Sequence, residues 1–444
     1  MNTLTEERTL TEDNLLTGFA AFESRLNGEA STPLHQVRRE AVKVLEAKGF
    51  PTTKHEDWRY TNFTPQLEKQ WNEVKSDTHI SIDQKMLSGF LPEGFDANLV
   101  VLVDGFWNEE LSSINEEDKN IIIAPFSQAI KSHKALVEAH FAKYANFENN
   151  GFAAANTAYA RQGVFIHVPR GKRLSLPVHV LYISGANEKP FVQLRNLIVA
   201  EENAEVTVVE NYQSFAENES FTNVVTEIYA AQNARVEHYK LQLENTQANH
   251  VNLTQIHQQR DSHVRNFTVA LGGNILRNDL NYTLDDQNCE AYLNGLYISA
   301  DSQLIDNHSF VDHAKPNCYS NEFYKGIMMH QSTAVFNGKI MVRPDAQKTN
   351  AYQSNKNILL SPEAKINAKP QLEIFADDVK CSHGATTGQL DEEALFYMRS
   401  RGIGEEDARA ILTFAFAEDV LLDIKDEFLR AFLETKVAEK LRRK

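Results

Sequence analysis

The stretch EENAEVTVVENY, residues 201–212, decides the fold, because its opening turn returns 30 residues later in AQNARVEHY, residues 231–239. Each turn contains an Asn and leads into a strand with alternating side chains. A second pair repeats this spacing: QSTAVF and SPEAKI, at residues 331–336 and 361–366, which would set Ala334 and Ala364 in register. Recurrence at periods of roughly 20 to 50 residues is typical of stacked coils.

The region from about Phe152 to His383 has the same character throughout. Short runs rich in Val, Ile, Thr and Tyr are broken by Asn, Asp and Gly, and no long amphipathic helix interrupts them. Two longer segments also resemble each other, AYLNGLYI from Ala291 and AVFNGKIM from Ala334. Both place Asn-Gly after a short apolar strand. Strands without intervening helices exclude a doubly wound α/β sheet and leave a sandwich, a barrel, a propeller or a solenoid. The recurrence favours a parallel β-helix, with Asn and Gly at the corners of its coils, where positive φ is tolerated.

The chain divides into three regions. We expect a helix-containing region over residues 1–150, a parallel β-helix core over residues 151–388 and a helical domain over residues 389–444. Thr32 and Pro33 form a cap and first-turn pair, which predicts a helix from Pro33 that ends at Gly49.

The C-terminal helices begin at Asp391, whose carboxylate suits a helix start. Their apolar residues exceed what one buried face needs; they are Ala408, Ile411, Leu412, Phe414, Phe416, Val420 and Leu421. A solenoid also exposes apolar core at an open end and unpaired backbone at its edges, which must be capped or paired. Both features predict a protein partner.

Composition limits the classes of partner and the compartment. Across 444 residues, 45 Lys and Arg stand against 61 Asp and Glu, which gives a net charge of −16. This excess argues against nucleic acid or a membrane surface as the main partner. The start, MNTLTEERTL, lacks the basic and apolar regions of a signal peptide, so we expect a cytoplasmic protein. The three cysteines are too few for a disulfide framework, and we expect reduced thiols.

The common catalytic motifs are missing. The sequence contains no GxxxxGK[ST], GxGxxG, HExxH or GxSxG, so the chain is not expected to hydrolyse ATP itself. Sugar-cleaving enzymes also use parallel β-helices, and a carbohydrate-active enzyme therefore remains the alternative function. Its pair of catalytic carboxyl groups cannot be identified from spacing, because the acidic residues are spread along the chain.

Two segments carry candidate metal ligands. The first, NHSFVDHAKPNC, contains His308, Asp312, His313 and Cys318. Its spacing matches no standard zinc site, and a separation of five would put the two histidines on opposite faces of a strand. Structural packing is the favoured interpretation of this segment, and the roles of its side chains stay open.

The second segment, ADDVKCSHGATTG, contains Cys381 and His383, which are two residues apart and would face the same side of a strand. Thiolate and imidazole suit iron or an iron–sulfur cluster. Two ligands cannot complete a site, so any metal bound there needs groups from elsewhere, including another chain. The alternative is a buried thiol beside an ordinary surface imidazole.

The sequence resembles the SufB/SufD family of iron–sulfur cluster assembly proteins over almost its whole length. Six separated segments match in order: GFPTTKHEDWRYTN, NTAYARQGVFIHVPRG, RNLIVAEENAEVTVVENY, FTNVVTEIYA, DHAKPNCYSNEFYKG and DVKCSHGATTGQLDEEALFYMRSRGI. The Cys-Ser-His-Gly segment and the segment around Trp58 resemble the SufD branch more than the SufB branch.

The resemblance implies a right-handed parallel β-helix between helical regions, in a non-catalytic scaffold subunit of the SufBCD complex. It implies pairing with SufB and binding of the SufC ATPase by the C-terminal helices. Because exposed edges seek partners, we expect the SufB contact near Leu372 to Lys380 and a homodimer through the same strands as an option for the isolated chain. The cofactor it implies is a transient iron–sulfur cluster shared with SufB, with none stably bound by the isolated chain. Within Cys381 and His383, the histidine is the stronger candidate ligand.

Overall fold

The computed structural model describes residues 8–26, 29–74, 82, 84–115, 120–185, 187–214 and 217–442. Most of the stretch MNTLTEERTL, on which the expected lack of a signal peptide rests, therefore lies outside the described residues. Within the described ranges, no helix is long and apolar enough to cross a membrane.

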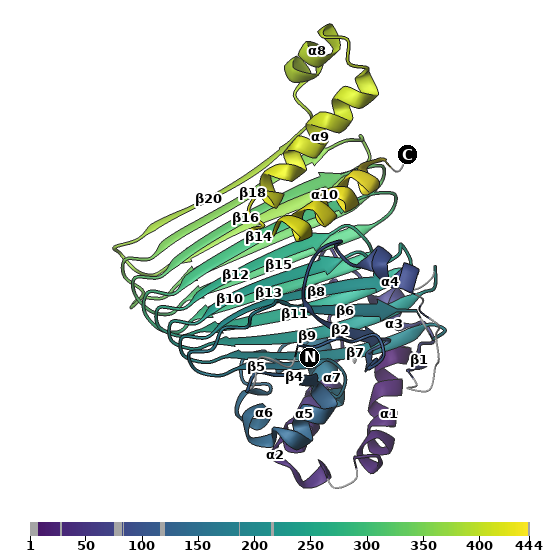
Figure 1. Ribbon diagram of the computed structural model, residues 1–444, viewed down its shortest axis with the longest axis vertical. Helices are drawn as coiled ribbons and strands as arrows, with labels where there is room; N and C mark the ends of the chain where they lie inside the picture. The colour runs from purple at the N-terminus through teal and green to yellow at the C-terminus, as the bar shows by residue number, and fades with distance from the viewer. Residues whose placement is uncertain are drawn as a thin grey trace, which may run out of the picture.

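Two long sheets form the body of the molecule (Figure 1). Consecutive strands alternate between the sheets, so each pair of strands makes one coil of a solenoid. The first sheet contains β5 (Val164–Val168), β7 (Pro190–Ala200), β9 (Ser220–Ala230), β11 (Ala248–Gln258), β13 (Ile275–Leu284), β15 (Leu304–His313), β17 (Thr333–Val342) and β19 (Lys365–Ile374). The second contains β6 (Val178–Ser184), β8 (Glu205–Ser214), β10 (Arg235–Gln242), β12 (His263–Ala270), β14 (Glu290–Ser299), β16 (Tyr319–Met328), β18 (Asn350–Leu359) and β20 (Lys380–Gly388).

The pairing between coils is parallel and in register, which confirms the predicted parallel β-helix. Arg235 in β10 pairs with Glu205 in β8, so the two turns that set the 30-residue repeat stack on each other. At these corners Asn203 and Asn233 both have positive φ, and the Asn233 side chain donates to Asn203 Oδ1 over 2.7 Å. The corner role predicted for Asn is therefore confirmed at these turns.

The predicted register of Ala334 with Ala364 is wrong, and so is the predicted corner position of the two Asn-Gly pairs. Ala334 pairs with Ile366 and not with Ala364, because the coil from β17 to β19 is two residues longer than the 30-residue echo assumes. Ala291 and Ala334 do not stack either, since they lie in β14 and β17, which belong to different sheets. Their Asn-Gly pairs lie inside strands: a Cβ on Gly295 would lie 2.1 Å from the Tyr324 ring, so the glycine makes room for an aromatic side chain.

The lumen between the sheets is the main core. Inward-facing Val, Ile, Leu and Ala side chains stack from coil to coil, with tyrosines such as Tyr182, Tyr212 and Tyr282 among them. Burial of this continuous apolar column is what stabilises a solenoid, since each coil lacks a core of its own.

Most of the N-terminal helices cover the outer face of the first sheet, whereas α4 (Gln84–Phe90) packs against Leu181 and Ile183 of the second sheet (Figure 1). The predicted helix is confirmed as α2 (Pro33–Lys48), with Thr32 as N-cap and Gly49 as C-cap at φ 65°. The aromatic rings of Trp58, Phe63 and Phe152 pack against Phe221 of β9. The other helices of this region are α1 (Leu10–Ser24), α3 (Thr64–Leu67), α4 (Gln84–Phe90), α5 (Phe126–Ser132), α6 (Lys134–His140) and α7 (Gly151–Tyr159).

Strands from the first 150 residues also join the two sheets. β2 (Asn98–Val103) pairs in parallel with β6, and β3 (Phe106–Trp107) pairs with β2. β4 (Ile122–Pro125) pairs with β5 in the antiparallel sense, and β1 (Asn72–Glu73) pairs with β7. The solenoid therefore begins with strands that precede residue 150.

The C-terminal helices lie on the second sheet and extend beyond it (Figure 1). α9 (Glu405–Leu421) and α10 (Glu427–Arg442) bury Val420, Leu421 and Leu433 against the outer face of the sheet. α8 (Glu392–Ser400) begins at Asp391, whose carboxylate accepts from the backbone N–H groups of the first turn. Together with the start of α9, it projects away from the solenoid.

Candidate functional site

The candidate site lies at the open end of the solenoid, which we define as strands β19 and β20. Side chains of the earlier strands are mostly buried, whereas those of β20 are exposed along almost its whole length. No described strand pairs with the far edge of either β19 or β20. Apolar side chains are uncovered nearby, with Ile374 40% and Phe375 61% exposed. This end has the unpaired backbone that recruits another chain.

Cys381 and His383 both lie on the inner face of β20. Cys381 pairs in register with Ala351, and His383 with Gln353, and both of these β18 residues are buried in the lumen. Parallel in-register strands keep paired residues on the same side, so the two candidate ligands face the end of the lumen together. The spacing of two residues predicts this arrangement correctly.

The two candidate ligands differ in exposure. Cys381 is half-buried against the lumen core, and this burial raises the pKa of its thiol. His383 is exposed. A thiol must lose its proton to bind a metal, whereas a neutral imidazole needs no such step. The raised pKa of the thiol therefore works against metal binding by Cys381.

Beneath His383 the lumen contains a buried polar pair that the sequence analysis does not single out. Gln353 Nε2 donates to Glu322 Oε2 over 2.8 Å, and Glu322 pairs in register with Gln353. Burial raises the pKa of Glu322 to about 7, although the hydrogen bond from Gln353 and the nearby Ser309 hydroxyl oppose this. The coil period is the signal that could have found them, because they precede His383 by one and two coils.

The ligands of the first segment do not form one site. His308 faces outward from β15, where its Nε2 lies 3.0 Å from Asp306 Oδ1. His313 faces the lumen and is fully buried, with its Nε2 2.8 Å from Ser320 Oγ. The odd separation of five therefore places the histidines on opposite faces, as predicted.

Cys318 forms a buried thiol pair with Cys289 of the preceding coil. Their sulfur atoms lie 3.2 and 3.1 Å from the same backbone oxygen, that of Asp286. The hydrogen bond between the two thiols lowers the pKa of Cys318, which His313 lowers further, and it raises the pKa of Cys289. Both thiols are fully buried, which fits the packing interpretation of this segment.

A cavity of about 140 Å³ lies between the segment around Glu56 and the outer face of β15, β17 and β19. Among its lining carboxylates, Glu56 forms an ion pair with Lys369 at 2.7 Å and Asp306 one with Arg277 at 2.6 Å. Burial would raise the pKa of Asp306, but Arg277 and His308 outweigh it and hold the pKa well below its usual range. A glycoside hydrolase needs one carboxyl group that stays protonated as the acid, and these carboxyl groups do not fit that role.

Within the part of the chain that the structure describes, no group of three or more His, Cys, Asp and Glu side chains is placed to hold a metal ion. Cys381 and His383 thus offer two candidate ligands, and an iron–sulfur cluster bound between them would need further ligands from elsewhere.

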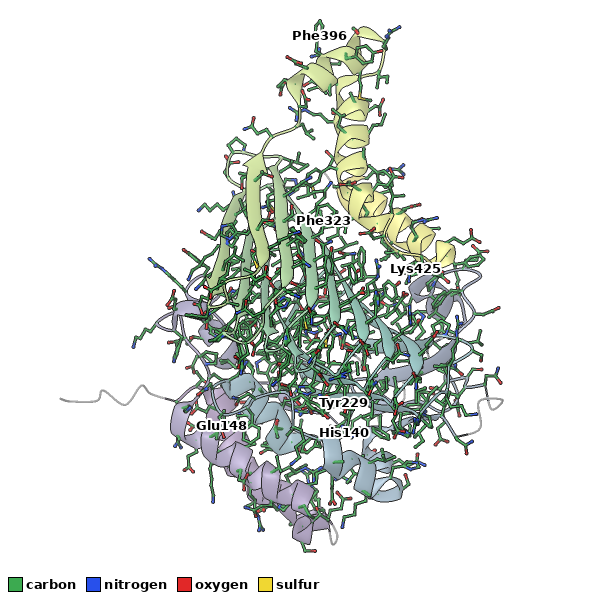
Figure 2. All side chains as sticks on the ribbon, turned by 90° about the vertical axis from the view of Figure 1, so that its left-hand side faces the viewer. His140, Glu148, Tyr229, Phe323, Phe396 and Lys425 are labelled. Atoms are coloured by element: carbon green, nitrogen blue, oxygen red, sulfur yellow. The ribbon has the colours of Figure 1, made fainter. Side chains whose placement is uncertain are left out.

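A second exposed surface lies on the projecting helices. Phe396 and Tyr397 of α8 are 73% and 59% exposed, and Phe396 lies at the far tip of the molecule (Figure 2). Ile411 of α9 is also exposed. Phe414 and Phe416, in contrast, pack against the apolar cluster on the second sheet. Exposed apolar side chains therefore lie on α8 and the first half of α9, and Leu422 and Phe428 are also exposed near the junction of α9 and α10.

Comparison with known proteins gives matches over nearly the whole chain. Residues 182–416 match the family model described as SUF system FeS cluster assembly, SufBD core domain, and residues 10–180 match the SufBD protein N-terminal region. An iron–sulfur cluster assembly SufBD family protein of Synechocystis is 33% identical over 409 residues, covering 90% of this chain and 89% of the relative. The iron–sulfur cluster assembly protein SufD of Escherichia coli is 31% identical over 90% of this chain and 91% of its own. SufD of Bacillus subtilis is 27% identical over 92% and 94%.

Proposed function

The chain belongs to the SufBD family of iron–sulfur cluster assembly proteins and is a homologue of SufD, and from this we propose that it is a non-catalytic scaffold subunit. In this proposal it pairs with SufB, binds the SufC ATPase and acts in the cytoplasm. Its cargo is a nascent iron–sulfur cluster that it shares transiently with SufB and does not hold stably alone.

One observation carries the proposal: the open end of the solenoid presents Cys381 and His383 on one face, beside unpaired strand edges. A partner that extends the sheets across β19 and β20 would bring its own side chains opposite these two residues. Such an arrangement supplies the ligands that this chain lacks. It also places the cluster at an interface, where separation of the subunits can release it.

The C-terminal helical domain, residues 389–444, is the proposed docking site for SufC. Its exposed side chains, Phe396, Tyr397 and Ile411, lie on the part that projects from the solenoid, so a partner can reach them without displacing the core. Their chemistry fits the apolar centre of a protein interface. The isolated chain can use its open end in the same way and form a homodimer.

The test is the His383→Ala variant, purified in complex with SufB and SufC homologues and reconstituted with iron and sulfide. We expect the complex to assemble normally and its iron and sulfide content to fall, because the variant loses a ligand and no buried contact. His330→Ala, which removes a 41% exposed imidazole at a corner of the solenoid, is the matched control and should retain full content. Full iron and sulfide content in the His383→Ala complex would overturn the assignment of this site.

Failure to recover SufB and SufC homologues with the tagged wild-type chain would overturn the scaffold role itself. This outcome is separate from the site test, because complex formation does not require the cluster ligands.

A further inference from the structure

The strand next to β20, β18, carries Gln353, a buried side chain whose carbonyl accepts no hydrogen bond within the part of the chain that the structure describes. Gln353 is 3% exposed and pairs in register with His383, so both side chains lie on the inner face. Its Nε2 donates to Glu322, while its Oε1 accepts no hydrogen bond from any described residue. Leaving a buried polar atom unpaired costs roughly 1–3 kcal/mol, and the position of this one, beside His383 on the neighbouring strand, points to a donor from that residue.

The opposite sheet is shaped around the Gln353 amide. Gly338 of β17 faces it across the lumen, and a Cβ on this glycine would lie 2.3 Å from Gln353 Nε2 and 2.8 Å from its Cδ. Real Cβ atoms essentially never make such short contacts, so a larger residue at this position would displace the amide from where it lies. The amide is therefore confined between Gly338 and Glu322.

Glu322 fixes which end of the amide faces outward. It is 1% exposed and pairs in register with Gln353, so it lies one coil deeper in the lumen. Its Oε2 accepts the Gln353 N–H at 2.8 Å, which leaves the Gln353 carbonyl as the group available toward the open end. Glu322, Gln353 and His383 thus occupy equivalent positions on three neighbouring strands of the second sheet, one in each successive coil.

A metal-bound histidine nearly always donates its second ring N–H to a carbonyl or carboxylate, which fixes the tautomer and the orientation of the ring. Neighbouring strands lie about 4.8 Å apart, so an imidazole on β20 is within reach of an amide on β18. We propose that Gln353 is a positioning residue for His383, whose imidazole N–H its side-chain carbonyl accepts, and that Glu322 holds the amide in that orientation. This proposal rests on His383 being a cluster ligand.

The experiment compares three variants in the complete complex reconstituted with iron and sulfide. Gln353→Leu removes the acceptor at similar volume. The double variant Glu322→Gln, Gln353→Glu exchanges the two partners and keeps an acceptor under His383. Asn355→Leu is the control, because Asn355 is equally buried on the same face of β18 but pairs with Ala385.

We measure iron and sulfide content and the rate at which a chelator removes the iron. Gln353→Leu should lose iron faster, on the order of 10- to 100-fold, while the exchanged pair and Asn355→Leu should stay within a few-fold of wild type. Equal loss in Gln353→Leu and Asn355→Leu would mean that a general disturbance of the lumen is responsible, and wild-type retention in Gln353→Leu would exclude the positioning role. If His383→Ala itself retains the cluster, the proposed site fails; if only Gln353→Leu retains it, the positioning role alone fails.

Discussion

Lys325 of β16 forms an ion pair with Asp419 of α9 across 2.6 Å and donates to the backbone carbonyl of Phe416 over 3.0 Å. Its ammonium also lies 4.3 Å from the centre of the Phe416 ring. The lysine side chain is 5% exposed, so these contacts are shielded from water on the solenoid side. Lys325 therefore helps to hold the C-terminal helices against the outer face of the second sheet.

Replacing Lys325 with Met should loosen this attachment by about 1–2 kcal/mol, because a buried charge-assisted hydrogen bond is lost while the apolar stem is kept. Amide hydrogen exchange in α9 and α10 should accelerate, with the inner strands unchanged. Lys436→Met, which removes an ion pair with Glu439 on the surface of α10, serves as control. Unchanged exchange in the Lys325→Met helices would show that the apolar contacts alone hold them.

SufC docking should depend on the projecting residues. Phe396→Asp and Ile411→Asp should each weaken binding of a SufC homologue by about tenfold or more, since apolar anchors dominate interface energies. Both side chains are exposed, so the melting temperature should change little. Binding can be measured by calorimetry with the purified subunits.

Phe414→Asp is the comparison variant. Phe414 packs against the second sheet, so this substitution should lower the stability of the C-terminal helices as well as SufC binding. Full affinity in both Phe396→Asp and Ile411→Asp would place the SufC surface elsewhere.

Binding of a SufB homologue should protect the open end of the solenoid. Backbone amides between Leu372 and Lys380 should exchange more slowly in the complex, because this segment ends β19 and begins β20. Amides of β13, already paired on both sides with β11 and β15, should not change. Equal exchange of residues 372–380 with and without SufB would remove them from the interface.

Glu322 should make stability depend on pH. Burial raises the pKa of its carboxyl group to about 7 in the folded chain, from an ordinary value of 4.5. The folded state then keeps a proton that the unfolded chain loses, so stability falls as pH rises from about 4.5 to 7, by at most about 3 kcal/mol. Glu322→Gln removes this loss, and its melting temperature relative to wild type should be higher at pH 8 than at pH 5.

The exposed Glu363→Gln is the control for that comparison. If the difference between Glu322→Gln and wild type is the same at both pH values, Glu322 does not titrate in this range.

Thiol labelling should distinguish the cysteines. Cys381 is partly exposed, whereas Cys289 and Cys318 are fully buried, so a maleimide should modify one thiol in the native chain and all three in denaturant. The rate at Cys381 should rise with pH, because burial raises the pKa of this thiol and the thiolate is the reactive form. Cys381→Ser should abolish labelling of the native chain, and a second reactive thiol in that variant would contradict the packing of the other two.

The sequence by itself determined the class of fold. Short β-branched runs, the return of the Asn203 turn at Asn233, and the cap pair of α2 are local signals, because they depend on side-chain preferences within a few residues. It also placed Cys381 and His383 on one face, since a spacing of two fixes the side within any strand.

Only the tertiary structure decided the register. Coil lengths vary because corners absorb extra residues, so Ala334 meets Ile366 and not Ala364. For the same reason the coil period gives only approximate positions beneath His383, and the structure was needed to show that Gln353 and Glu322 occupy them and that Gly338 from the other sheet lies against the amide. Nor could it separate the packed Phe414 from the exposed Phe396. Each of these facts depends on which surfaces meet across tens of residues, and hydrophobicity along the chain does not encode that choice.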